Sequence, residues 1–220
     1  MRFETLESQD GVAAAFLVRP DGGRDDALRE LDIAPGRMVQ CEQVHGDHVA
    51  VVRREDLGEN ATSVHTVGEA DGLATGERGV ALTIRVADCV PVYLVSPVCI
   101  ALVHAGRRGA RLRIAEKAAR VMTGGCGVRP SEIRALIGPS AGPCCYEVSA
   151  AMAAEWSEAG LPARGRRLDL WEANRRQLVT AGVSNDRIEV TGECTICSGR
   201  YYSYRRGDKG GRNVAVLLRR

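Results

Sequence analysis

Two histidines and one cysteine carry the strongest chemical signal in this chain. They are His45, Cys89 and His104, and each lies beside a short apolar run, within two residues of a glycine or a proline. Two imidazoles and one thiolate are good ligands for a divalent metal such as zinc. Three protein ligands leave a fourth coordination position free, which is typical of catalytic rather than structural zinc. The residue types therefore predict the active site of an enzyme.

The same residues also suit a metal-free reaction. Cys89 could act as a nucleophile with His104 as its base, which is the arrangement of a Cys–His hydrolase or amidase. The spacing matches no established metal motif such as His-Glu-x-x-His, so it does not separate the two interpretations. A covalent acyl group on Cys89 would identify the hydrolase.

Arginines that lie among glycines are candidates for anion binding. Gly106 and Gly109 enclose Arg107 in a turn that we expect to open a helix, and backbone N–H groups at a helix start attract anions. A second cluster, residues 203–212, contains Arg205, whose planar guanidinium suits phosphate or carboxylate. Solvated surface turns explain both clusters as well.

Two aspartates in turn-like segments are candidates for contact with substrate and for proton transfer. They are Asp71 and Asp88. Aspartate is also a common turn-capping residue, so this structural role explains both positions equally well.

Four further cysteines are grouped in the sequence. Cys194 and Cys197 form a C-x-x-C pair, and Cys144 and Cys145 are adjacent. A lone C-x-x-C is a weak metal signal because structural zinc needs a second pair, and adjacent cysteines rarely bridge each other. We expect no disulfide among these four in a reducing compartment, and no zinc bound through Cys194 and Cys197.

The order of apolar and amphipathic segments predicts an α+β fold without a regular βαβ rhythm, in one domain spanning residues 1–220. The clearest helix begins near Ile114, with apolar residues at i, i+4, i+7 and i+8, and ends at Gly124. Two more helices are expected at 149–159 and 169–182. Strands are expected at 12–18, 38–44, 49–52, 80–86, 91–95, 99–103, 135–137, 188–190 and 214–218.

The bulk properties are those of an ordinary globular protein. The chain has 220 residues, of which 45% are apolar and 26% charged. Its net charge of +2 is too small to indicate a nucleic-acid partner. No stretch is apolar enough to cross a membrane, and the first residues lack the apolar core of a signal peptide. We therefore expect a cytoplasmic protein.

A set of short motifs occurs in a fixed order from about Met38 to the end of the chain. These are Gln-Val-His-Gly at 43–46, Ala-Asp-Gly-Leu-Ala-Thr at 70–75, Ala-Asp-Cys-Val-Pro at 87–91, His-Ala-Gly at 104–106, Gly-Pro-Cys-Cys-Tyr-Glu-Val at 142–148, Asp-Leu-Trp-x-x-Asn at 169–174, Cys-Thr at 194–195, Ser-Tyr-Arg-Arg at 203–206 and Gly-Arg at 211–212. The ordered set closely resembles the YfiH-like family. This family is also called the multifunctional purine nucleoside phosphorylase or polyphenol-oxidase laccase-domain family.

The resemblance implies a layered α/β/β/α fold with mixed sheets. It also implies that His45, Cys89 and His104 are catalytic and hold Zn²⁺, with copper as an alternative. The implied reactions are phosphorolysis of adenosine, inosine, guanosine and S-methyl-5'-thioadenosine, together with adenosine deamination. The implied partners are therefore small molecules, a purine nucleoside and phosphate.

The residues expected to bind substrate and phosphate are Arg107, Arg205 and Asp71. Two features depart from the family pattern. Arg107 stands where family members usually have Trp, and the segment between Arg19 and Met38 is shorter.

Three other functions compete with the phosphorylase. A multicopper oxidase needs a blue-copper site and a trinuclear cluster, both rich in imidazole, and the chain has only four histidines. A Cys–His amidase could act in editing cell-wall precursors. A metal-dependent binding protein would keep the metal site and turn over no nucleoside.

Overall fold

The central strand β7 (Val90–Val95) shows how the sequence builds two cores, because all of its side chains are buried. Val92 and Leu94 pack in the core beneath the helices, whereas Tyr93 and Val95 pack in the core between the two sheets. A strand that is buried on both faces needs apolar residues at every position, which explains its continuous apolar run. The computed structural model describes residues 1–3, 6, 11–18, 31, 33–57 and 63–220.

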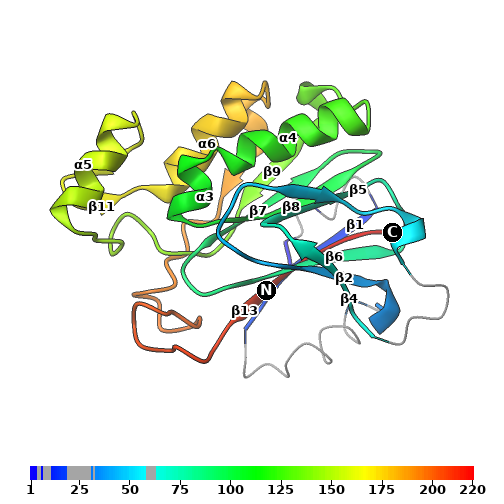
Figure 1. Cartoon of the computed structure of the whole chain (residues 1–220), viewed down its shortest axis with the longest axis horizontal. Helices are drawn as coiled ribbons and strands as arrows, with labels where there is room; N and C mark the ends of the chain where they lie inside the picture. Colours follow the sequence, from blue (N-terminus) through cyan, green and yellow to red (C-terminus); the bar gives the residue numbers. More distant parts are fainter. Residues whose placement is uncertain (4–5, 7–10, 19–30, 32, 58–62) are drawn as a thin grey trace.

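Two mixed sheets face each other in the described part of the chain (Figure 1). The six-stranded sheet has the order β12 (Ile188–Val190), β9 (Arg134–Ile137), β7, β8 (Ile100–Ala105), β5 (Gly72–Thr75) and β3 (Val49–Val51). The five-stranded sheet has the order β1 (Val12–Leu17), β13 (Asn213–Arg219), β6 (Val80–Val86), β2 (Met38–Glu42) and β4 (His65–Glu69). Parallel and antiparallel pairs occur in both sheets.

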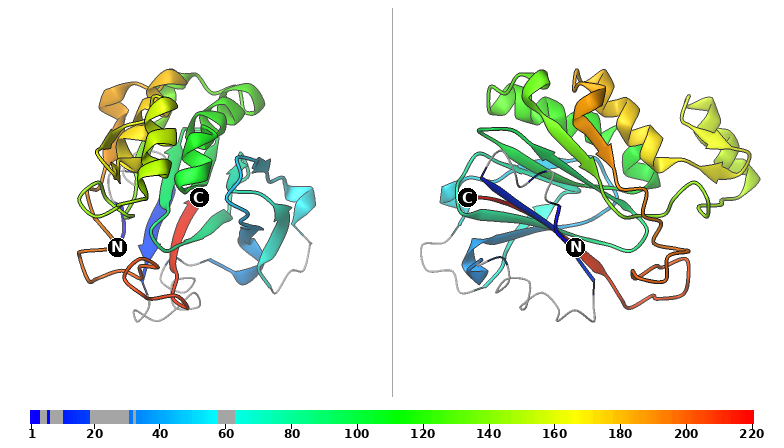
Figure 2. Two further views of the ribbon diagram at one scale, coloured as in Figure 1. Left: turned by 60° about the vertical axis from the view of Figure 1, so that its left-hand side comes forward. Right: turned by 180° about the vertical axis from the view of Figure 1, so that it is seen from behind.

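Three of the described α-helices, α3 (Arg107–Arg111), α4 (Ile114–Gly125) and α6 (Leu170–Thr180), cover the outer face of the six-stranded sheet (Figure 2). The helix α5 (Ala150–Glu158) lies beside the sheet, against β10 (Ala163–Arg164) and β11 (Arg167–Leu168). Short 3₁₀ turns are η1 (Pro35–Arg37), η2 (Arg54–Asp56), η3 (Pro130–Glu132) and η4 (Asn185–Arg187). None of the described helices is long and apolar enough to cross a membrane, and the cytoplasmic location stays a prediction.

The predicted fold class is confirmed, because the chain mixes helices with mixed sheets. The described residues form three layers, with the helices stacked on the six-stranded sheet and that sheet stacked on the five-stranded one. The second outer helical layer of the predicted α/β/β/α order is not seen among the described residues, and most of the short segment after Arg19 (19–30 and 32) lies outside them.

Most predicted elements are present, with shifts of a few residues at their ends. Four short strands show what the apolar pattern missed. β4 is polar and lies at a sheet edge, β5 has only four residues, and β10 (Ala163–Arg164) with β11 (Arg167–Leu168) forms a minimal hairpin. Such segments have little apolar periodicity, so their pairing depends on neighbours that are distant in sequence.

Candidate metal centre and cleft

His45 lies in the connection between β2 and β3, where the chain passes from one sheet to the other. Its backbone has a φ of 59°, in the left-handed region that non-glycine residues adopt only with support. Asp71 supplies that support, because its carboxylate accepts hydrogen bonds from the backbone N–H groups of Val44, His45 and Gly46. The N–H of His45 is 3.0 Å from Oδ1 of Asp71.

His104 lies near the end of β8 and is bound to the same aspartate. Its Nδ1 is 2.7 Å from Oδ1 of Asp71, and its backbone N–H donates to the carbonyl of Asp71 over 2.7 Å. Burial lowers the pKa of His104, but the bonds to Asp71 and Cys89 outweigh it and raise the pKa to about 9. In metal-free protein both ring nitrogens therefore carry a proton, with Nδ1–H donating to Asp71 and Nε2–H to Cys89, and a metal bound at Nε2 would displace the second proton. A carboxylate behind a histidine in this way is the usual support of a metal-ligating imidazole.

Cys89 lies in the tight turn between β6 and β7, the second passage between the sheets. Asp88, directly before it, also has a positive φ, of 83°. Gly106 leaves room for the thiol, since a Cβ at that position would lie 2.8 Å from the Cys89 sulfur. The sequence places a glycine here because any side chain would displace the cysteine.

The three side chains converge as predicted. Their potential ligand atoms all lie within 4.8 Å of one another, and the rings of His45 and His104 meet edge to face. Burial raises the pKa of the Cys89 thiol, but hydrogen bonds with His104 and His45 outweigh it and lower the pKa to about 6. Two neutral imidazole nitrogens and a thiolate form a donor set that fits a divalent ion such as zinc.

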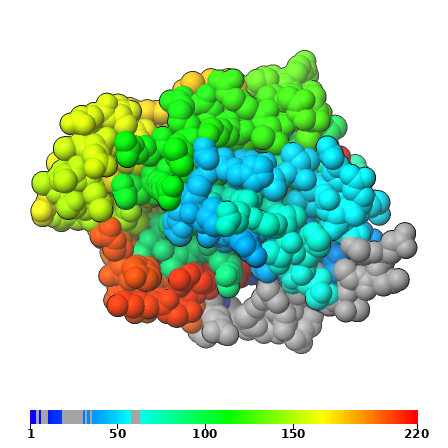
Figure 3. Space-filling view, in the orientation of Figure 1, coloured from blue at the N-terminus to red at the C-terminus, as the bar shows by residue number. Residues whose placement is uncertain are grey.

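A cleft of about 450 Å³ opens directly onto the trio. Segments that are far apart in sequence meet around it. Two of them, the 45 region and the 200–212 segment, lie on the face of the molecule shown in Figure 3. The lining residues are Gln43, His45, Arg85, Ala87, Asp88, Cys89, His104, Tyr146, Leu170, Tyr204, Arg205 and Arg212. A separate cavity of about 620 Å³ is lined by residues that include Glu147, Arg164, Arg166 and Arg167, and no residue of the trio lines it.

The predicted binding residues fall in different places. Arg205 lines the cleft, and its guanidinium lies over the ring of Tyr146, 4.8 Å from the centroid. Arg107 is not among the lining residues, and the helix that it opens, α3, has only five residues. Asp71 is fully buried behind the histidines. Asp88 lines the cleft while its carboxylate accepts from Thr195 Oγ1 and from the backbone N–H of Arg205.

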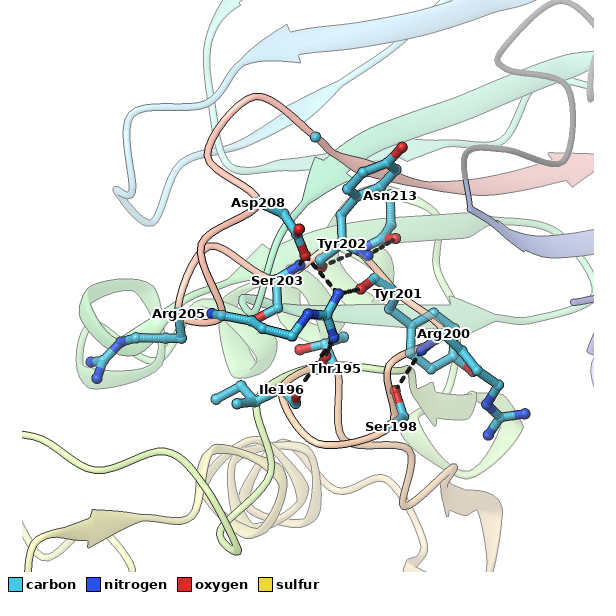
Figure 4. A network of polar contacts seen from close by, with 12 residues as sticks. Thr195, Ile196, Ser198, Arg200, Tyr201, Tyr202, Ser203, Arg205, Asp208 and Asn213 are labelled. Atoms are coloured by element: carbon cyan, nitrogen blue, oxygen red, sulfur yellow. Dashed lines mark hydrogen bonds and ion pairs between the residues drawn. The ribbon is translucent and has the colours of Figure 1, made fainter.

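A network of hydrogen bonds holds the loop that carries Arg205 (Figure 4). The guanidinium of Arg206 donates to the carbonyls of Thr195 and Ile196 and to the carboxylate of Asp208. The side chain of Asn213 joins this loop to β6 and to Tyr202. In the figure, the side chain of Arg205 points away from this network, which leaves it directed toward the cleft that it lines.

The family match covers nearly the whole chain. A sequence model of the family described as "Multi-copper polyphenol oxidoreductase laccase" matches residues 22–220. The chain belongs to this family. One relative in it is the protein named purine nucleoside phosphorylase YlmD of Geobacillus stearothermophilus. It is 40% identical over 199 residues, covering 84% of this chain and 73% of that protein.

Solved structures agree with this laccase-family assignment. The crystal structure of YlmD from Geobacillus stearothermophilus has a TM-score of 0.81 and 33% sequence identity, covering 96% of this chain and 92% of that chain. The hypothetical protein YfiH of Bacillus licheniformis has a TM-score of 0.84 and 29% identity, covering 95% and 93%. The predicted YfiH-like resemblance is therefore confirmed.

Some lining residues of this laccase-family chain were missed by sequence reasoning. Arg85 is the exposed member of the otherwise buried strand β6, so one charged residue in an apolar run was its signal. Gln43 was seen only as part of a motif. Its side-chain amide exchanges two hydrogen bonds of 2.8 Å with the backbone of Arg85 and so ties the His45 loop to β6.

Proposed function

We propose that this chain is a metal-dependent purine nucleoside phosphorylase. The observation that carries the proposal is the charge of the cleft beside the trio. Arg85, Arg205 and Arg212 line it, and none of the three forms a salt bridge with a carboxylate among the described residues. Many other arginines of the chain are paired in this way. Arg205 donates to the carbonyl of Glu147, and Arg212 donates to the carbonyls of Lys209 and Gly211, but these neutral partners leave the positive charges in place. Guanidinium groups that share a cleft without a carboxylate partner suit a phosphate anion.

In this proposal the three arginines orient phosphate toward the sugar of a bound nucleoside. A phosphate oxygen forms a bond to C1' of the ribose as the bond from C1' to the purine nitrogen breaks, which yields ribose 1-phosphate and the free base. Tyr204, which is 54% exposed at the cleft, offers a face on which the purine can stack.

The proposed substrates are adenosine, inosine, guanosine and S-methyl-5'-thioadenosine, with deamination of adenosine as a second reaction of the same site. His45, Cys89 and His104 would hold the metal, because their donor set and the Asp71 support of His104 fit a zinc-type ligand shell. A divalent ion held there would act as a Lewis acid and activate water, which is the chemistry that deamination needs. The names of the relatives support the phosphorolytic activity.

The decisive measurement is release of ribose 1-phosphate from inosine against phosphate concentration, using protein of known metal content. The wild type should show saturable dependence on phosphate. Arg85→Ala should raise the KM for phosphate about 10- to 100-fold, as expected for loss of one charge-assisted contact. Arg205→Lys should act in the same direction, because Lys replaces a planar fork with a point charge.

Arg164→Ala is the matched control, because Arg164 is an exposed arginine of the other cavity and should leave the phosphate KM unchanged. Ammonia release from adenosine should tolerate Arg85→Ala and should be lost in Cys89→Ala. Base release that is the same with and without phosphate would defeat the phosphorylase and favour a hydrolase.

One observation favours a second function. Cys89, His104 and Asp71 form a hydrogen-bonded series, with the lowered pKa of Cys89 and the Asp71 bond to His104 expected of a cysteine hydrolase. A hydrolase or amidase, for instance on cell-wall precursors, would form an acyl group on Cys89. Intact-protein mass spectrometry of a quenched reaction would detect that group, and the metal-dependent phosphorylase should show none.

The polyphenol oxidase named in the family description is poorly supported by this chain. Its four histidines are His45, His48, His65 and His104. Within the described residues, His48 and His65 belong to no group of potential metal ligands. The trio could hold one copper, but the chain lacks the imidazoles for a second, trinuclear site.

A further inference from the structure

Four cysteines outside the catalytic trio converge on one point. Cys144 and Cys145 lie in the loop after β9, and Cys194 and Cys197 lie in the loop after β12. Their sulfur atoms all lie within 4.8 Å of one another, and those of Cys144 and Cys197 are 3.9 Å apart. All four are free thiols. The sequence suggested a lone C-x-x-C, whereas the fold supplies the second pair that a metal site requires.

The spacing of the sulfurs suits a tetrahedral ion. Zinc–sulfur bonds of about 2.3 Å place the four sulfurs of a tetrahedron about 3.8 Å from each other. The 3.9 Å between the sulfurs of Cys144 and Cys197 is close to this value. A disulfide would need about 2.0 Å between two sulfurs and would leave the other two without a role.

The backbone around Cys194 is arranged for a thiolate. The N–H of Gly142 donates to its sulfur over 3.3 Å, and the N–H groups of Ile196 and Cys197 are also directed at it. Several N–H groups that converge on one sulfur stabilise negative charge, and such bonds are usual around metal-bound cysteines. Gly142 also avoids a collision, because a Cβ there would lie 2.6 Å from the ring of Trp171.

We propose that Cys144, Cys145, Cys194 and Cys197 bind a structural Zn²⁺ ion as a closed tetrathiolate site, separate from the catalytic trio. Soft thiolates in a tetrahedral arrangement select zinc, and four protein ligands leave no position for substrate. Each thiol gives up its proton to solvent as its sulfur bonds to the ion. Arg206 binds the carbonyls between Cys194 and Cys197, and so brings a positive charge close to the resulting dianion.

The ion would fasten the loops that form the cleft. Thr195, next to Cys194, donates to Asp88 over 2.7 Å, and the other oxygen of Asp88 accepts from the backbone of Arg205 over 2.8 Å. Ala141, on the cysteine loop after β9, donates to the carbonyl of Asp88 over 2.9 Å. A zinc that joins the two cysteine loops would therefore fix the aspartate beside Cys89 and the loop that carries Arg205.

The test uses Cys89→Ser, which removes a ligand of the trio and leaves the four-cysteine cluster intact. We expect the zinc-loaded, reduced variant to retain about one zinc per chain after dialysis, with X-ray absorption showing a shell of sulfur alone near about 2.3 Å. Adding Cys194→Ser and Cys197→Ser should remove that zinc. Cys126→Ser is the matched control, because Cys126 lies outside both clusters, and it should retain the zinc.

Three results would overturn the proposal. These are absence of zinc from the Cys89→Ser protein, a zinc shell that contains nitrogen, and a disulfide among the four cysteines in protein purified with zinc and reductant. If the variant that combines Cys89→Ser with Cys194→Ser and Cys197→Ser does not fold, X-ray absorption and zinc counts on the wild-type protein test the same site. A sulfur-rich shell with more than one zinc per chain is then expected, and a single zinc with one sulfur contradicts it.

Discussion

At the scale of single residues, Asp71 assembles the site. Its carboxylate binds three successive N–H groups of the His45 loop and the ring of His104. Burial raises the pKa of Asp71, but the bond to His104 and the N–H groups outweigh it, so its pKa is lowered and it stays ionised. One buried carboxylate thus sets the position of two of the three trio residues.

Asp71→Asn should therefore weaken metal binding and activity together. An amide retains one acceptor oxygen, and its NH₂ group is wrongly matched to the donors around it. We expect a loss of about 10- to 100-fold in zinc affinity and a matching fall in nucleoside turnover. Zinc competition with a chromophoric chelator, alongside inosine phosphorolysis, measures both.

Asp47→Asn makes the same chemical change in the same loop, where Asp47 pairs with Lys117 at the surface. This control should keep wild-type zinc affinity. Unchanged zinc affinity in Asp71→Asn would show that the carboxylate does not support the trio.

Cys89 should be reactive at neutral pH in metal-free protein. Its pKa is about 6, so it is largely thiolate at pH 7 and becomes protonated as the pH falls through about 6. The rate of iodoacetamide alkylation at Cys89 should follow that curve. Cys41 is an internal reference, because burial raises its pKa to about 12 and should keep it unreactive. Peptide mapping of alkylated protein over roughly pH 4.5–8.5 tests this. An alkylation rate at Cys89 with its midpoint at about pH 8.5, the value of an unperturbed cysteine, would contradict it.

Residue types alone were enough to predict the trio, because His45, Cys89 and His104 are uncommon, reactive residues beside turn formers. They were not enough to predict Arg85, because arginine is abundant in this chain and only its place as the one exposed residue of the buried strand β6 distinguishes it. The four-cysteine cluster was missed for a related reason. Each of its two cysteine pairs is by itself a weak signal for a metal site, and the pairs come together only because β9 and β12 pair in parallel.

At the scale of elements, short junctions between strands matter more than the strands themselves. The strands β6, β7 and β8 could be predicted from their apolar runs. The direction in which the backbone leaves the sheet at the end of each strand could not be predicted. His45 and Asp88 both adopt positive φ at such exits, a strain of about 1–3 kcal/mol at each position that the surrounding hydrogen bonds must offset.

Gly106→Ala should disrupt the junction between β8 and α3. The new Cβ would lie 2.8 Å from the sulfur of Cys89, so the thiol or the backbone must move. We expect zinc affinity and activity to fall sharply, with a loss of about 1–3 kcal/mol in the free energy of unfolding. Urea denaturation and metal analysis measure the two effects.

Gly124→Ala provides the comparison, because nothing lies within 4 Å of its new Cβ in α4. It should keep activity and stabilise the helix by about 0.5–1 kcal/mol. Full metal binding in Gly106→Ala would show that the junction can absorb a methyl group.

At the scale of the whole molecule, the core between the two sheets fixes how the sheets lie against each other. It therefore also fixes where His45 and Cys89, which follow strands of the five-stranded sheet, lie relative to His104 in the six-stranded sheet. Tyr93 is fully buried in it, packs edge to face on Phe3, and donates a hydrogen bond of 3.0 Å to the carbonyl of Ala15. This bond joins the six-stranded sheet to an edge strand of the other sheet.

Tyr93→Phe should lower the free energy of unfolding by about 1–3 kcal/mol, because the buried carbonyl of Ala15 loses its hydroxyl partner. Urea denaturation followed by circular dichroism measures this. Tyr204→Phe removes a hydroxyl from an exposed ring and should change stability by less than about 0.5 kcal/mol. Equal stability of Tyr93→Phe and the wild type would mean that water replaces the hydroxyl.

The passages of the chain between the sheets also bear on how the protein folds. His45 and Cys89 each lie where the chain leaves the five-stranded sheet for the six-stranded one, and His104 lies in the latter. We therefore expect the trio to come together only after both sheets have formed and docked. Cobalt could replace zinc at these residues in a refolding experiment. The absorbance of the bound cobalt would then report when the trio assembles, and we expect it to appear only at the last, long-range step.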